Sequence, residues 1–154
     1  MKFLYSLTRG HAQLGRWLDR LHSLLLLGTR FYVGWQFTNS GWIKITSWDS
    51  TLGLFRNEYH VPLLPPDVAA VMGTCGELGF PILLYLGLFT RLGALGTFFV
   101  NTMAVISYRQ VLYADGAVPL DHYLWGYMLL VVMIFGPGKI SLDHWLERRA
   151  ARAA

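Results

Sequence analysis

Four apolar stretches limit the folds open to this chain more than any other feature of its sequence. They run over residues 22–43, 67–88, 91–113 and 119–135. At about 1.5 Å of rise per helical residue, each is long enough to cross roughly 30 Å of hydrocarbon. The pattern predicts an all-α, polytopic membrane protein built as a bundle of four transmembrane helices.

The composition favours the same class of protein. Hydrophobic residues make up 54% of the 154 residues and charged residues 14%, whereas soluble domains carry roughly 25% charged residues. A soluble protein of this size has a large surface to cover with polar groups, and nine acidic and thirteen basic side chains are too few. The alternative, that the stretches are buried helices of a soluble protein, is disfavoured for that reason. The single cysteine, Cys75, excludes an intramolecular disulfide and a metal site made of cysteines alone.

The basic residues predict the orientation, because cytoplasmic segments of membrane proteins are enriched in Lys and Arg. The turn before the fourth stretch contains Asp115 and Asp121 but no base. We therefore expect a multi-pass membrane protein with both termini in the cytoplasm. This topology explains the basic charge balance without a nucleic-acid partner. The bases at the two ends are Lys2, Arg9, Arg16 and Arg20, and Lys139, Arg148, Arg149 and Arg152.

The chain divides into three parts. Residues 1–21 form a basic segment in which leucines recur at helical spacing, from Leu4 and Leu7 onward. This spacing is typical of a helix lying on the membrane surface, although a flexible basic tail is a competing interpretation. No cleavable signal peptide is expected. Residues 22–136 form the membrane domain, and residues 137–154 a basic cytoplasmic tail.

Three polar residues fall inside the predicted spans. Counted from the cytoplasmic ends, Arg30 lies at about 12 Å, Glu77 at about 16 Å and Asn101 at about 15 Å. Because charges at membrane depth need partners, we expect an Arg30–Glu77 pair with the Asn101 amide beside it. The cluster is either structural, or it binds a polar head group such as a quinone ring or relays protons.

Proline and glycine add local detail to the second and third spans. Pro81 removes the hydrogen bond that would otherwise reach the carbonyl of Glu77, which predicts a bend there. The glycines of these spans are expected to mark close helix contacts. They are Gly73, Gly76, Gly79, Gly93 and Gly96.

No residue pattern identifies a catalytic or metal centre. His60 and His122 are expected on the outward side, and His22 and His144 on the inward side. None of these histidines has ligand spacing on one helix. Neither a metal site nor haem is therefore expected, and no tightly bound cofactor is predicted. The sequence alone does not decide whether the protein is an enzyme.

The segment from Arg30 to Lys44 (RFYVGWQFTNSGWIK) resembles the first span of the DoxX family of small bacterial membrane proteins. Glu77, followed by an apolar run and the Thr90–Arg91 turn, is similar to the family's second span. The resemblance covers roughly residues 24–136. The positions that carry it are Arg30, Gly34, Phe37, Ser40, Gly41, Lys44, Glu77, Thr90 and Arg91.

The resemblance implies a four-helix protein of the bacterial inner membrane. The wider family includes members associated with quinone-linked or other redox systems, and many members have no assigned activity. The function expected from it is that of an accessory subunit or partner of a quinone-linked or other oxidoreductase, with a quinone as a candidate ligand. Homo-oligomers are also expected as an assembly form. The alternative function is that of a small-molecule transporter or a membrane-integrity protein with no redox role.

Overall fold

The computed structural model describes the backbone of residues 2–153. It describes the side chains of Gly15, Leu18 and residues 21–153. The leucines predicted to form an apolar stripe, Leu4, Leu7 and Leu14, lie outside the described side chains. Leu18 and Leu21, at the end of that pattern, are exposed.

The protein is all-α, and no strand occurs in residues 2–153. Short loops separate most of the helices, with a longer connection over residues 58–65. The helices are α1 (Lys2–Thr46), α2 (Trp48–Asn57), α3 (Pro66–Leu86), α4 (Thr90–Ser107), α5 (Arg109–Leu112), the 3₁₀ turn η1 (Ala114–Gly116), α6 (Leu120–Phe135) and α7 (Leu142–Ala153).

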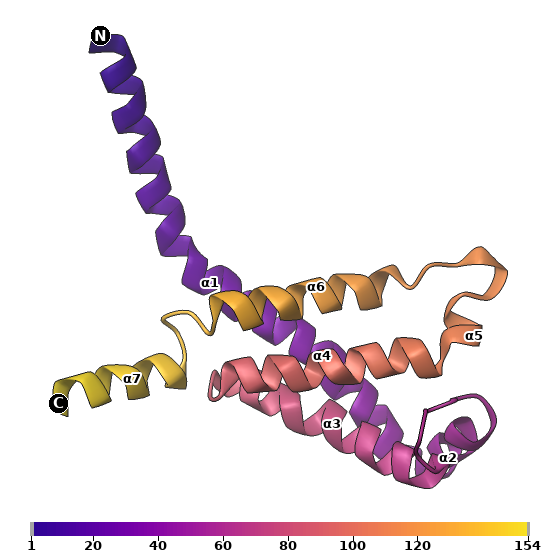
Figure 1. Cartoon of the computed structure of the whole chain (residues 1–154). Helices are drawn as coiled ribbons and strands as arrows, with labels where there is room; N and C mark the ends of the chain where they lie inside the picture. The colour runs from indigo at the N-terminus through magenta and orange to yellow at the C-terminus, as the bar shows by residue number, and fades with distance from the viewer. Residues whose placement is uncertain (1, 154) are drawn as a thin grey trace.

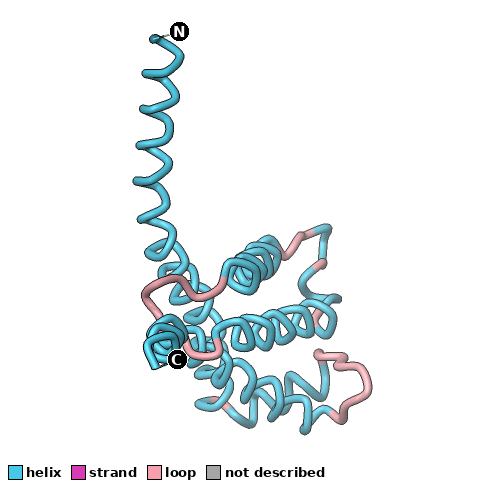
Figure 2. Tube along the Cα trace, turned by 60° about the vertical axis from the view of Figure 1, so that its left-hand side comes forward, coloured by secondary structure: helices cyan, strands magenta, loops and turns pink. Residues whose placement is uncertain are grey.

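Four of these helices pack side by side (Figure 1). The second half of α1 lies against α3, α3 lies against α4, α4 lies against α6, and α6 also touches α1. The first half of α1 projects away from the other helices, and α7 extends from the opposite end of the chain without any buried residue (Figure 2). The packed helices α1, α3, α4 and α6 are called the helical body below.

The centre of the helical body is apolar. Val33 and Phe37 from α1 meet Leu84 from α3, Ala94 from α4, and Leu129 and Val132 from α6. A second, smaller cluster joins Phe55 of α2 to Ala69 and Ala70 of α3. Many large apolar side chains on the outer surface are exposed, including Phe99, Tyr127 and Ile134. An exterior of that kind is typical of helices that contact lipid.

The described helices differ in how well each suits a membrane. In residues 2–153 only α3 is both long and apolar enough to cross a bilayer by itself, and α6 is apolar but shorter. The α1 and α4 helices contain Arg30, Lys44 and Arg91 within their packed lengths. The predicted segment 67–88 falls on α3 and 119–135 on α6, whereas 91–113 extends past α4 into α5.

The glycines in the helical body do not all have the same role. A Cβ on Gly93 of α4 would lie 2.8 Å from Cβ of Leu83 and 3.2 Å from the Phe80 carbonyl oxygen of α3. On Gly76, it would lie 2.8 Å from a methyl of Val100, and Gly96 lies against the Phe80 ring. Gly79 instead faces open space, so the expectation of a close contact is wrong for that residue.

Replacing Gly93 by alanine should destabilise the protein. The new methyl would press against backbone atoms of α3 that cannot rotate away, and overpacking of this kind costs about 1–3 kcal/mol. The matched control is Gly79→Ala, which should be neutral or stabilising by up to about 1 kcal/mol through helix propensity. Thermal unfolding in detergent measures both variants, and equal stability of the two would contradict the α3–α4 packing.

Candidate functional site

A buried ion pair joins α1 to α3. The Lys44 ammonium donates hydrogen bonds of 2.7 Å to each carboxylate oxygen of Glu77 and one of 2.8 Å to the Ser40 hydroxyl. The two charged side chains are only 12% and 10% exposed. All three N–H donors of the ammonium are therefore used. Gly41 brings the helices together here, since a Cβ on it would lie 2.8 Å from Cγ of Leu78.

The expected Arg30–Glu77 pair does not form. Helices α1 and α3 are antiparallel, with Gly34 facing Tyr85 and Gly41 facing Glu77. In this register Arg30 lies about eleven residues, or roughly 16 Å, from the level of Glu77. The predicted depth of Arg30 was counted from an assumed start of the first span at His22. Helix α1 continues unbroken through that position, so His22 does not mark the start of the helix.

Arg30 instead belongs to a second polar cluster at the other end of the helical body. It is fully buried, and its Nη2 atom donates a 2.6 Å hydrogen bond to the Ile140 carbonyl. Nearby, the Asp143 carboxylate of α7 accepts hydrogen bonds from the backbone N–H groups of Phe89 and Thr90 at 2.7 and 2.9 Å, and from the Thr90 hydroxyl at 2.8 Å. These bonds satisfy donors at the start of α4 that have no partner within that helix.

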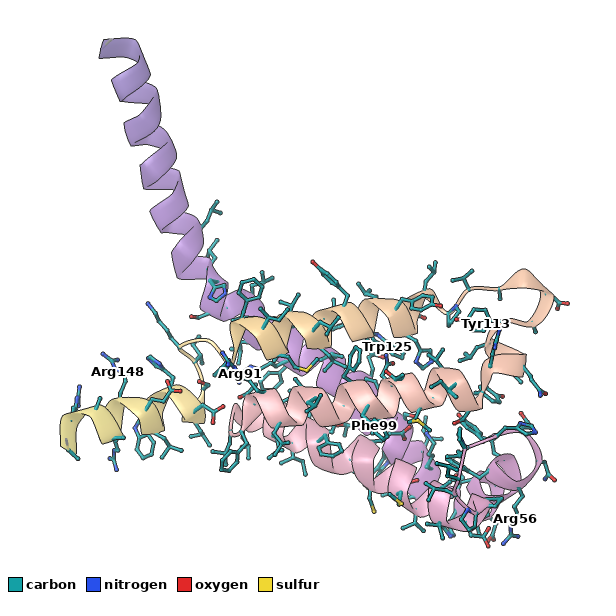
Figure 3. The ribbon with its side chains drawn as sticks, in the orientation of Figure 1. Arg56, Arg91, Phe99, Tyr113, Trp125 and Arg148 are labelled. Atoms are coloured by element: carbon teal, nitrogen blue, oxygen red, sulfur yellow. The ribbon has the colours of Figure 1, made fainter. Side chains whose placement is uncertain are left out.

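Asn101 occupies a third position, between α4 and α6. Its amide nitrogen donates to the His122 carbonyl and its amide oxygen lies 2.9 Å from Nδ1 of His122. The amide is therefore not beside the Glu77 carboxylate. Trp125 of α6 lies nearby, 5.8 Å from Phe37 of α1 between ring centroids (Figure 3).

An aromatic stack lies at the end of the helical body next to α2. The Tyr59 ring lies 4.6 Å from both the Phe55 ring and the Tyr108 ring, nearly parallel to each. The Tyr108 hydroxyl donates to the Glu58 carboxylate at 3.0 Å. Burial, the negative charge of Glu77 and the neighbouring Tyr108 and Glu58 raise the pKa of Tyr59 to about 12.

A pocket of about 400 Å³ opens beside this stack. Apart from the Tyr59 hydroxyl, its polar side chains are Arg56 and His60. Figure 3 places Arg56 far from Arg91, at the other end of the helical body. Arg56 binds Asp67 through Nε and Nη2, both at 2.8 Å. His60 Nδ1 lies 3.0 Å from the Glu58 carbonyl, which can only accept, so Nδ1 carries the proton and Nε2 is left as an acceptor. The apolar lining is Phe55, Tyr59, Val61, Pro62, Leu64 and Pro66.

The residues of the predicted signature fall into separate places. Ser40, Gly41, Lys44 and Glu77 come together at the ion pair. Other members of the signature lie elsewhere: Arg30 and Thr90 contact the residues before and in α7, Gly34 packs on Tyr85, Phe37 lies in the apolar centre, and Arg91 lies near Gly136. The signature therefore maintains contacts along the second half of α1, with α3 and with the start of α4.

Several residues of these clusters were not among the predicted site residues, and Asp143 and Tyr59 are two examples. Asp143 is in a tail whose sequence reads as exposed and basic, and only the fold brings it to α4. Tyr59 is in the connection between α2 and α3, and its neighbours Phe55 and His60 are close to it in the sequence. No group of three His, Cys, Asp or Glu side chains suited to a metal ion occurs in the described part of the chain.

The apolar exterior of the all-α body, and α3 as the helix of residues 2–153 that is long and apolar enough to span a bilayer, favour the class of helical membrane proteins. The DoxX family matches residues 25–110, and the chain belongs to that family. An uncharacterised protein of Haemophilus influenzae is 29% identical over 139 residues, which covers 82% of this chain and 84% of the relative. No solved structure matches the chain.

Removing one partner of the Lys44–Glu77 pair should destabilise the protein strongly. Lys44→Met leaves a carboxylate between apolar helices, which costs about 3–5 kcal/mol, whereas Lys44→Met combined with Glu77→Leu should recover most of that loss. The matched control is Arg56→Met, because the Arg56–Asp67 pair is more than half exposed and solvent screens it, so that its loss should change stability little. Denaturant titration in detergent compares the three variants. Equal losses for Lys44→Met and Arg56→Met would contradict the burial of the pair.

Tyr59 should ionise only in strongly alkaline solution. Because its pKa rises from 10 to about 12 on folding, its stabilising contribution is complete below pH 10 and is lost as the pH rises through 12. The phenolate absorbance of the wild type minus that of Tyr59→Phe isolates this titration. Glu77→Gln should lower the midpoint but keep it above 10, since burial is the larger cause. An unshifted midpoint near 10 in the wild type would contradict the buried stack.

Proposed function

We propose that the protein is a four-span helical bundle of the bacterial inner membrane, with α1, α3, α4 and α6 as the spans and both termini in the cytoplasm. The basic residues at both ends of the chain support this orientation. Spans as polar as α1 and α4 are stable in lipid when their charged groups find partners inside the bundle. Lys44 has such a partner in Glu77.

Within that bundle, the outward pocket binds the ring of a quinone. The observation behind this proposal is that Arg56 and His60 line the same pocket of about 400 Å³, whose other lining residues are aromatic or aliphatic. Arg56 uses two of its five N–H donors on Asp67. The others are free to donate to a ring carbonyl, while the Phe55–Tyr59 stack supplies a flat apolar wall. Small-molecule sites commonly combine an apolar lining with a few such polar groups.

His60 can accept a proton at Nε2, because the Glu58 carbonyl holds its proton on Nδ1. A quinone would accept two electrons and two protons on reduction, and its quinol would release both on oxidation. The residues of this chain would position the ring, and His60 would accept one of the two protons released by the quinol, the other passing to water. The role of the protein is therefore that of an accessory subunit or partner, with the electrons of the quinol passing to an oxidoreductase that docks on it.

The ion pair has a supporting part in this function. Lys44 is saturated by Glu77 and Ser40, so it does not bind the ring directly. It holds α1 against α3 next to α2, because the Thr51 hydroxyl of α2 donates to the Lys44 carbonyl. Breaking the pair should disturb the pocket by moving α2.

Binding of a short-chain ubiquinone analogue to the protein in nanodiscs tests the proposal. Arg56→Gln and His60→Gln should each weaken binding about tenfold, the loss of one good polar contact, with helix content unchanged. Quenching of tryptophan fluorescence provides the readout, because Trp48 packs against the Phe55 cluster.

Arg109→Gln is the matched control, since Arg109 is an exposed base of α5 that does not line the pocket. Equal affinity of Arg56→Gln and wild type would overturn the quinone site. Recovery of the protein alone after mild solubilisation, together with solute flux in liposomes, would favour the transporter function.

A further inference from the structure

The cluster at the start of α4 is built like an anion-binding site, and a side chain of the protein occupies it. The Phe89 N–H, the Thr90 N–H and the Thr90 hydroxyl all donate to one carboxylate, that of Asp143, over 2.7–2.9 Å. Backbone N–H groups at a helix start, aided by the helix dipole, bind phosphate as readily as carboxylate.

The buried Arg30 is a second and independent indication of an anion. Its side chain is fully buried, yet Nε and Nη1 have no hydrogen-bond partner among the described residues. Nη1 lies against Gly87, whose carbonyl accepts the backbone N–H of Asp143. The carboxylate of Asp143 acts on the guanidinium through its charge but does not bond to it. A guanidinium has a planar array of donors suited to an anion with several oxygens.

The Asp143 carboxylate is held by a weakly attached element. Helix α7 contains no buried residue, and it extends away from the helical body (Figure 1). Three of its residues, Leu142, Trp145 and Leu146, expose apolar surface, while Arg149 covers the Trp145 ring at 4.0 Å. The helix is therefore anchored mainly through its first turn and the residues before it.

We propose that the α4 start and Arg30 form a binding site for a phosphate group, and that Asp143 is a tethered, displaceable occupant of it. The donors at Phe89 and Thr90 engage two oxygens of the anion. Inorganic phosphate has further oxygens for the free Arg30 donors, and each terminal oxygen of a lipid phosphodiester accepts more than one hydrogen bond, so that it can bind Arg30 as well. Binding releases α7 from the helical body. The phosphate belongs either to a phospholipid head group or to a soluble ion. This site lies at the opposite end from the quinone pocket and does not depend on it.

Hydrogen–deuterium exchange of the full chain in nanodiscs tests the proposal. The three conditions are phosphatidylcholine discs, the same discs with inorganic phosphate, and discs containing phosphatidylglycerol. We expect phosphate to speed exchange over residues 142–146, while the amides of Phe89 and Thr90 stay protected because the new ligand replaces Asp143. A response only to phosphatidylglycerol identifies a lipid head group, and a response to both identifies any accessible phosphate.

Variants separate this site from a general attraction of the basic tail to anionic membranes. Asp143→Asn removes the competing charge. Because the Asp143 carboxylate then no longer occupies the site and lowers the apparent affinity for lipid, the variant should retain phosphatidylglycerol about tenfold more tightly in native mass spectrometry. Asp115→Asn is the matched control, as Asp115 is an exposed acid in the η1 turn. Thr90→Val and Arg30→Lys should each abolish the exchange response. Arg30→Lys keeps the positive charge at this buried position, so that the variant tests the guanidinium and not the loss of charge.

Two results would overturn the proposal. One is unchanged exchange of α7 in all three conditions, which would make Asp143 a permanent cap of α4. The other is an equal response of wild type, Thr90→Val and Arg30→Lys to phosphatidylglycerol, which would show that membrane charge alone moves the tail.

Discussion

The ion pair between Lys44 and Glu77 is the interaction on which the arrangement of the first two long helices depends. Two opposite charges in an apolar interior are stable only when they meet at hydrogen-bond distance, because each alone is costly to remove from water. Here both carboxylate oxygens bind one ammonium at 2.7 Å. A shift of one helical turn between α1 and α3 would separate the pair by roughly 5 Å. The pair therefore selects one register from those that the apolar surfaces alone would allow.

The other polar groups of the helical body follow from that register. Once Gly41 faces Glu77, Arg30 lies past the end of α3, where Gly87 leaves space for its guanidinium. The chain turns there through Gly87, at φ +62°, and through Phe89, at φ +45°. This turn exposes the first N–H groups of α4 to Asp143. At the other end, the same register leaves Lys44 to support α2 through the Thr51 hydroxyl. Two functional proposals, at opposite ends of the molecule, thus rest on one helix pairing.

Sequence reasoning reached the class of fold and most of the polar residues, but not their partners. Apolar stretches at 67–88 and 119–135 predicted helices close to α3 and α6, since composition and length govern such segments. The polar residues Arg30, Glu77 and Asn101 were correctly singled out as unusual. Their partners could not be predicted from their expected depth in the membrane. That depth was counted from the assumed end of each helix, and the count does not show how neighbouring helices are shifted relative to one another. The partners Lys44, Ile140 and His122 come from the end of a span, a loop and another helix.

The sequence by itself determined that this protein is helical and apolar outside, and which polar side chains must find partners within it. Membership of the DoxX family also follows from local strings of residues. Only the tertiary structure decided which charges meet, because an ion pair requires two side chains to approach within a few ångströms. That approach depends on helix register and on turns such as the one at Gly87. The tertiary structure also decided that the tail supplies Asp143 to α4. Asp143 lies 53 positions from Thr90 and 54 from Phe89 in the chain, and local sequence contains no sign of so distant a contact.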